Sequence, residues 1–98
     1  MTKTELIAVI SNSTGLTIKD ASAALDATLT TIMTEVASGG KVSLIGFGTF
    51  EKRHREARVG RNPRNNEEVT IPASDVPAFK AGKSFKEKVN PPAPKNGN

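Results

Sequence analysis

Cysteine, tryptophan and tyrosine are absent from the 98-residue sequence, and phenylalanine occurs only four times. Without cysteine the chain forms neither a disulfide nor a thiolate metal site, which fits a reducing compartment. The length predicts one domain, and so few aromatic side chains predict a thin hydrophobic core. A second chain is a reasonable way to complete such a core.

Long apolar runs are also missing. The uncharged stretches before residue 40 are rich in Thr, Ser and Ala, without the basic lead-in and apolar block of a signal peptide. No stretch approaches the ~18 to 20 apolar residues that span a bilayer. We therefore expect a soluble, cytoplasmic protein that has no membrane partner.

Residues that enzymes use for catalysis are scarce. His54 is the only histidine, and no acid is clearly placed in the sequence to orient it. Gly46 and Gly48 lack the Lys-Ser/Thr ending of a phosphate-binding loop. No carboxylate cluster suggests a two-metal nuclease. The sequence predicts no enzyme, no metal site and no cofactor.

Positive charge is concentrated in one segment. Residues 52–64, KRHREARVGRNPR, contain six Lys or Arg and one acid. Residues 1–51 have three basic and five acidic side chains, and residues 65–98 have five basic and four acidic ones. The net charge of +4 and the pI of about 9.7 therefore depend on residues 52–64. Such a segment is typical of a surface that binds a nucleic acid backbone.

Two helices are expected before this segment. Thr2 and Glu5 have the spacing of a capping box, and Gly15 can end the first helix in a left-handed conformation. Thr17 begins the second helix, which glycines 39 and 40 end. Its apolar side chains predict one buried stripe, formed by Ile18, Ala21, Leu25, Leu29, Ile32, Met33 and Val36.

A helix pair raises the hypothesis of a helix-turn-helix motif, in which the second helix enters the major groove. The charges disfavour it. Outside its stripe the second helix carries Asp26 and Glu35, and Lys19 is its only basic residue. Phosphates would therefore repel this helix.

A basic ribbon is expected after the helices. Val42 and Leu44 predict a strand, and the glycines around Phe47 indicate a bulge or a close backbone approach. Residues 51–59 continue as a strand with charges on both faces, and residues 60–71 form a turn and a returning strand that ends near Pro72. Eight residues each way give a ribbon of roughly 27 Å.

The C-terminal part predicts a short helix and a tail. Gly82 begins a helix with Phe85 and Val89 inward and with Lys83, Lys86 and Lys88 outward. Lys83 would suit a phosphate there, although an ordinary solvated lysine is an equal alternative. Residues 91–98 are expected to form a flexible tail.

Three segments carry a resemblance to a known family: LIGFGTF at 44–50, RVGRNPRN at 58–65 and VPAFKAGKSFKEKV at 76–89. They resemble the bacterial HU family of histone-like, DNA-bending proteins, to which integration host factor is related. The resemblance covers residues 1–90. It implies an α+β fold with a two-helix N-terminal body, a three-stranded antiparallel sheet, a long β-ribbon arm at about 52–75, a short C-terminal helix and an intertwined dimer.

The resemblance also implies which residues bind DNA. Pro63 matches the apolar residue that wedges between base pairs, and Phe47, Phe50 and Phe79 match the aromatic cluster of the dimer core. Asn65 departs from the Thr common in the family, and we expect the turn to form with altered contacts. The implied DNA-binding residues are Arg53, Arg55, Arg58, Arg61, Asn62, Pro63 and Arg64 on the arm, and Lys3, Lys80, Lys83 and Lys86 on the body.

The function that this resemblance implies is architectural. A homodimer would wrap the minor groove of double-stranded DNA, prefer bent, nicked or distorted duplexes, and compact the nucleoid without reading sequence. One alternative is a sequence-preferring bending protein like integration host factor. Another is an RNA-binding module, which would normally offer aromatic side chains for stacking, whereas every Phe lies outside residues 52–75.

Overall fold

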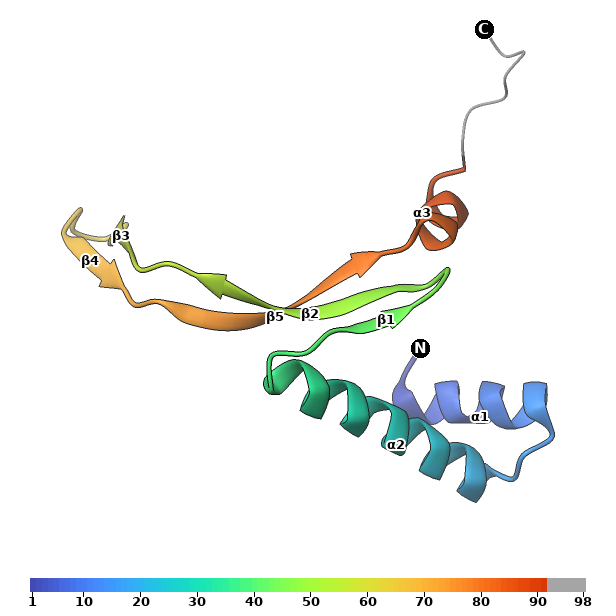
Figure 1. Cartoon of the computed structure of the whole chain (residues 1–98). Coiled ribbons are helices and arrows are strands. Elements are labelled where there is room, and N and C mark those ends of the chain that lie inside the picture. The colour runs from blue at the N-terminus through green and yellow to red at the C-terminus, as the bar shows by residue number, and fades with distance from the viewer. Residues whose placement is uncertain (92–98) are drawn as a thin grey trace, which may run out of the picture. The chain divides into compact units, whose positions relative to one another are not determined.

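The computed structural model describes residues 1–91, so the expected tail, apart from Pro91, lies outside the described residues. The chain divides into two compact units, Met1–Thr34 and Glu35–Asn98. Figure 1 shows the elements in order. They are α1 (Lys3–Thr14), α2 (Ile18–Ala37), β1 (Val42–Leu44), β2 (Gly48–Arg55), β3 (Arg58–Arg61), β4 (Glu68–Ile71), β5 (Ser74–Ala81) and α3 (Lys83–Val89).

The α+β class and the order of elements confirm the predicted fold of a single chain. Within residues 1–91, no helix has the length and apolar character needed to cross a membrane.

Helix α1 has the caps that the sequence predicts. Thr2 Oγ1 accepts a hydrogen bond from Glu5 N at 3.3 Å, and Glu5 Oε1 accepts one from Thr2 N at 3.3 Å. At the other end Gly15 has φ of 79° and donates its N–H to Ser11 O at 3.0 Å. The capping box and the left-handed glycine are therefore confirmed.

Helix α2 begins where expected, because Thr17 Oγ1 accepts a hydrogen bond from Asp20 N at 3.1 Å. The buried stripe is only partly confirmed. Ala21 and Val36 are the two buried hydrophobic residues of the described chain. By contrast, Ile18, Leu29 and Met33 are 57%, 41% and 64% exposed. A single chain thus leaves part of the stripe open to solvent.

Three strands form one antiparallel sheet in the order β1-β2-β5. A tight turn joins β1 to β2, with Gly46 at φ of 84° and Phe47 N donating to Leu44 O at 2.9 Å. Strand β2 pairs with β5 over its whole length, from Gly48 opposite Ala81 to Arg55 opposite Ser74. These two strands form the proximal half of a ribbon.

Strands β3 and β4 form the distal half of the same ribbon (Figure 1), with Arg58 opposite Ile71. The expected unbroken strand over residues 51–59 is therefore wrong, because pairing stops at Glu56 and Ala57. The opposite strand stops at Pro72 and Ala73, so each side loses two residues and the register is kept. Pro72 has no N–H to donate. It lies in the middle of the ribbon, not at its end.

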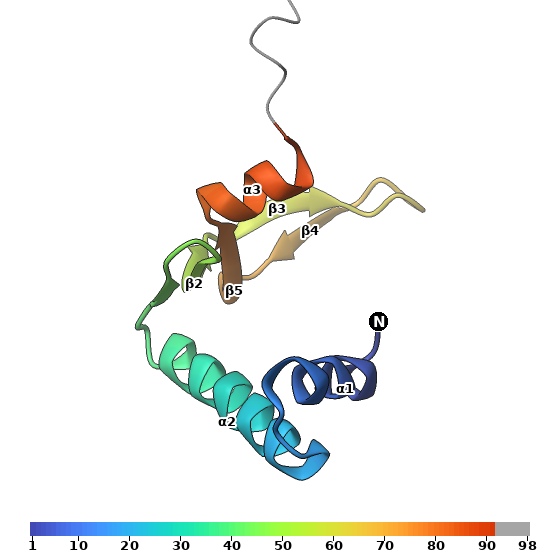
Figure 2. The ribbon, with the colours of Figure 1, turned by 90° about the vertical axis from the view of Figure 1, so that its right-hand side faces the viewer.

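Four phenylalanines gather near the base of the ribbon. Ring centroids are 4.8 Å apart for Phe50 and Phe79, and 5.4 Å apart both for Phe47 and Phe79 and for Phe47 and Phe85. Phe85 comes from α3, which faces the viewer in front of the ribbon in Figure 2. Val89 is 73% exposed, so its predicted inward position is wrong for the single chain.

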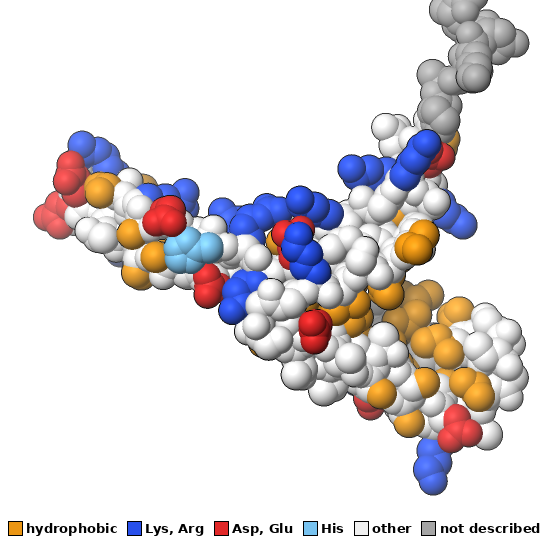
Figure 3. All heavy atoms as spheres, in the orientation of Figure 1, with side chains coloured by type: hydrophobic (Ala, Val, Ile, Leu, Met, Phe, Trp, Pro, Cys, Tyr) orange, Lys and Arg blue, Asp and Glu red, His pale blue; other side chains and the backbone are white. Residues whose placement is uncertain are grey.

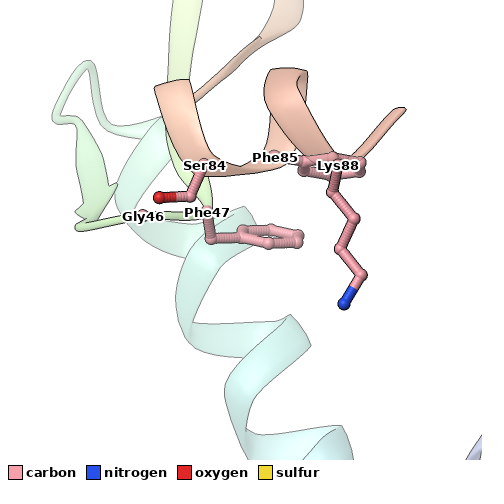
Figure 4. A pocket seen from close by; sticks show the side chains of 5 residues that line it. All are labelled: Gly46, Phe47, Ser84, Phe85 and Lys88. Atoms are coloured by element: carbon pink, nitrogen blue, oxygen red, sulfur yellow. The ribbon is translucent and has the colours of Figure 1, made fainter. Parts of the chain in front are cut away.

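A shallow pocket of about 310 Å³ lies beside this cluster. Figure 4 shows Phe47 and Phe85 in its wall, with Lys88 extended past them. The two rings stack at an interplanar angle of 29°. Their exposed faces mark an apolar surface that this chain alone leaves uncovered.

Candidate nucleic-acid interface

The ribbon brings the predicted arginines into one elongated basic surface. Arg53 and Arg55 lie on β2, and Arg58 and Arg61 lie on β3. All four are exposed. Figure 3 shows Lys and Arg side chains gathered along this part of the molecule.

The two faces of the proximal ribbon differ in charge. Successive side chains of a strand alternate between faces, and directly opposed residues share a face. Arg53 and Arg55 therefore share a face with Val76 and Ser74, neither of which is acidic. His54, on the other face, lies opposite Asp75. The arginine face keeps its positive charge.

Most arm arginines have no acidic partner. Arg61 is the exception, with Nη2 lying 3.7 Å from Glu68 Oε1 and Nη1 donating to Asn66 O at 3.0 Å. Within residues 1–91 no ion pair involves the other members of the predicted set, which are Arg53, Arg55, Arg58 and Arg64. Their guanidinium groups are available to an anion.

The tip turn is held by asparagine side chains. Asn62 Oδ1 accepts a hydrogen bond from Arg64 N at 2.9 Å, and Asn65 Oδ1 accepts one from Glu67 N at 3.1 Å. Asn66 has φ of 60°, a left-handed conformation that asparagine tolerates. The turn forms with Asn65 in place, as the sequence predicts. Pro63 lies exposed in it.

His54 has two acidic neighbours, so the expectation that no acid orients it is wrong. Its Nδ1 lies 2.8 Å from Asp75 Oδ1, and its Nε2 lies 3.2 Å from Glu56 Oε1. The hydrogen bond from His54, followed by the charge of Lys52 at 3.9 Å, lowers the pKa of the Asp75 carboxyl from its ordinary value of 3.8. Asp75 lies 21 residues from His54, so only the strand register reveals the pair.

Three of the four predicted body lysines already have acidic partners. Lys3 Nζ lies 2.6 Å from Asp26 Oδ1, Lys80 Nζ lies 3.6 Å from Glu51 Oε1, and Lys83 Nζ lies 3.9 Å from Glu87 Oε1. Lys86 has no ion pair within residues 1–91. The first three would exchange a carboxylate for a phosphate on binding DNA.

The predicted aromatic set Phe47, Phe50 and Phe79 is brought together, and Phe85 joins it. Phe47 and Phe79 remain 45% and 41% exposed. Among the described residues, no three His, Asp or Glu side chains are grouped so that they could hold a metal ion.

Comparisons with known proteins agree on one family. The sequence model described as bacterial DNA-binding protein matches residues 1–90. DNA-binding protein HU of Nostoc sp. is 54% identical over 92 residues, which are 94% of this chain and 98% of that protein. The HU protein of Geobacillus stearothermophilus is 54% identical over 89 residues, 91% of this chain and 99% of the relative.

Solved structures give the same result. The Anabaena HU–DNA cocrystal structure matches with a TM-score of 0.88 and 54% identity, covering 94% of this chain and 100% of that one. HU from Thermotoga maritima matches with a TM-score of 0.65 and 34% identity, covering 92% and 100%. With a basic ribbon, a matching fold and near-full-length identity, the chain belongs to the bacterial HU family of DNA-binding proteins.

Proposed function

We propose that this protein is an architectural DNA-binding protein that grips double-stranded DNA with its ribbon and bends it without reading its sequence. The observation that carries the proposal is the set of unpaired arginines on a ribbon that has no core of its own. Salt bridges hold down most other cations of the chain, whereas Arg53, Arg55, Arg58 and Arg64 lack such partners within residues 1–91. The function of the HU relatives supports the same conclusion.

The ribbon suits the minor groove. That groove presents mostly acceptors and separates A·T from G·C poorly, so an arginine-rich strand pair there responds to charge, groove width and deformability. Bending a site of this kind costs of order 1 to 6 kcal/mol, and a nicked or bent duplex already lacks part of that cost. The protein should therefore prefer distorted duplexes.

Within the arm the residues divide the work. The arginines and Asn62 hold the backbone, and Pro63 at the exposed tip inserts between base pairs. Unstacking a step costs a few kcal/mol, which the additional phosphate contacts of bent DNA offset. Lys3, Lys80, Lys83 and Lys86 contact the flanking backbone once DNA displaces their carboxylate partners.

The active form is a homodimer. Leu29, Phe47 and Phe79 are 41% to 45% exposed in one chain, which is unusual for side chains of this size in a stable fold. An identical chain offers the same apolar surfaces and can cover them in an isologous contact. Each subunit then contributes one arm.

The protein is not an enzyme, since its family consists of architectural DNA-binding proteins. A bending protein with little sequence preference would associate with the nucleoid in the cytoplasm and compact it. The sequence-preferring and RNA-binding alternatives lead to different binding profiles.

A competition experiment separates these functions. Linear, nicked and cruciform duplexes of one base composition would compete with a structured RNA at fixed salt, scored for affinity and for bending. We expect nicked and cruciform DNA to bind most tightly, and bending to accompany binding. Stronger binding to RNA than to every duplex, or a dominant preference for one linear sequence, would contradict the proposal.

A further inference from the structure

We propose that His54, Glu56 and Asp75 form a proton-responsive site on the arm, so that the affinity for DNA rises as pH falls through the range in which histidine gains charge. The inference rests on the proposed DNA-binding function. It assigns a role to side chains that the DNA-contact set leaves out.

The geometry favours a doubly protonated ring. His54 Nδ1 is 2.8 Å from Asp75 Oδ1 and Nε2 is 3.2 Å from Glu56 Oε1. A neutral imidazole has one N–H, whereas ionised carboxylates only accept hydrogen bonds. In the neutral form one ring nitrogen therefore faces a carboxylate with its lone pair. The imidazolium donates to both acids.

The charge of the site changes with that proton. The charged groups around His54 are Asp75 opposite it on β5, Glu56 just beyond β2, and Lys52, whose Nζ lies 3.9 Å from Asp75 Oδ2. With a neutral ring these groups sum to one negative charge, and with a protonated ring they sum to zero. No other histidine occurs in the chain.

The position of the site links it to binding. Arg53 and Arg55 flank His54 in β2, and they belong to the proposed DNA-contact set. Phosphates drawn to these arginines repel the carboxylates of Glu56 and Asp75 and favour the charged imidazole. DNA binding then takes up protons at His54, and by linkage lower pH strengthens binding. The side chain of His54 is 54% exposed, so solvent reaches it.

The sign of the effect follows from the charge of each state. At alkaline pH the neutral ring leaves an uncompensated carboxylate within the basic ribbon, and DNA binds less tightly. Histidine ordinarily gains its charge between about pH 8 and pH 5, so the change falls within that range. Screening by salt at the exposed site limits the effect to roughly threefold to tenfold in the dissociation constant between about pH 8 and pH 6.

Two variants bracket the native protein. His54→Gln keeps a polar side chain that never gains charge, and His54→Arg carries a permanent charge at the same place. The probe is a labelled nicked duplex at fixed salt, with its dissociation constant measured from about pH 8 to pH 6. Far-ultraviolet circular dichroism checks that both variants keep the native fold.

We expect the native protein to bind like His54→Gln near the alkaline limit and to approach His54→Arg near the acid limit. The difference from His54→Gln removes the contribution of the N-terminal amine, which also titrates near pH 8. The inference is overturned if native affinity is independent of pH, falls as pH falls, or keeps its pH dependence in His54→Gln. If none of the three proteins binds duplex DNA at either limit, the proposed function itself is wrong.

Discussion

Gly48 is the residue at which β2 and β5 come closest. A Cβ atom there would lie 2.5 Å from Phe79 Cε1 and 2.6 Å from Lys80 O. Both distances are shorter than carbon atoms tolerate, and one partner is backbone. The glycine that the sequence marks as a close approach thus allows the aromatic cluster to pack against the strand pair.

Gly48→Ala should destabilise the fold by roughly 1 to 3 kcal/mol, because the ring or the backbone has to move. Chemical denaturation followed by circular dichroism measures the change. Gly60→Ala is the matched control, since its Cβ would meet only the flexible end of Ile71 at 3.2 Å. Equal losses in the two variants would contradict the close-approach account.

Asp75 is the residue whose role depends most on its opposite neighbour. Its lowered pKa comes first from the hydrogen bond with His54. A carboxyl with a lowered pKa stabilises the fold above its unfolded pKa, and that contribution disappears as pH falls through the folded value.

In an NMR titration of the native protein, the Asp75 carboxyl should titrate below 3.8. In His54→Phe, which cannot donate this hydrogen bond, the midpoint should move up towards the ordinary value. An unchanged midpoint would mean that the hydrogen bond is absent in solution. The other acids of the ribbon tip, such as Glu67, serve as internal references.

The arm, as an element, combines a rigid register with a local interruption. The ladder stops at Glu56–Ala57 and Pro72–Ala73 and resumes without a shift. The arginines therefore keep their order along the ribbon on both sides of the break. With few paired backbone groups there, the distal half can bend without changing which residues oppose each other.

Arg53→Gln combined with Arg55→Gln should weaken binding and flatten its dependence on salt. Each arginine that contacts a phosphate contributes about 0.9 to the slope of log affinity against log salt. Titrations between about 50 and 200 mM salt measure this slope. Lys19→Gln, an exposed cation of α2, is the charge control and should leave the slope nearly unchanged.

Pro63→Ala should keep much of the affinity but reduce bending, because the arginines remain while the wedge is lost. Cyclisation of short duplexes reports bending directly. Pro77→Ala, in the outer strand of the three-stranded sheet, controls for the loss of a proline. Undiminished ring closure with Pro63→Ala would show that this residue is not the wedge.

For the molecule as a whole, the main feature is how little one chain buries. In its described part, only Ala21 and Val36 are buried hydrophobic residues, and large apolar side chains on α2, β5 and α3 stay exposed. A thin core is what four phenylalanines and no tryptophan or tyrosine predict. The stability of such a chain depends on its partner.

Leu29→Lys should shift the protein from dimer to monomer and raise the dissociation constant at least about tenfold, because an unpaired charge would be buried at the contact. Sedimentation velocity over a range of concentrations measures the shift. Thr31→Lys places the same charge on α2 outside the apolar stripe and should leave the dimer intact. A dimer unaffected by Leu29→Lys would exclude this face from the interface.

The sequence by itself determined the features that depend on neighbouring residues. The capping box of Thr2 and Glu5, the end of α1 at Gly15, the turn around Pro63 and the concentration of charge in residues 52–64 all involve groups a few positions apart. Short-range hydrogen bonds and turn preferences decide them, so local patterns are enough. The resemblance of longer segments supplied the family.

Only the tertiary structure decided what depends on strand register and packing. The pairing of His54 with Asp75, the interruption opposite Pro72 and the addition of Phe85 to the aromatic cluster join residues that the sequence separates. It also decided which cations are neutralised, since Lys3 and Lys80 find acids whereas Arg53 and Arg55 face none. Opposed side chains interact across strands, and no local pattern encodes which residues will be opposed.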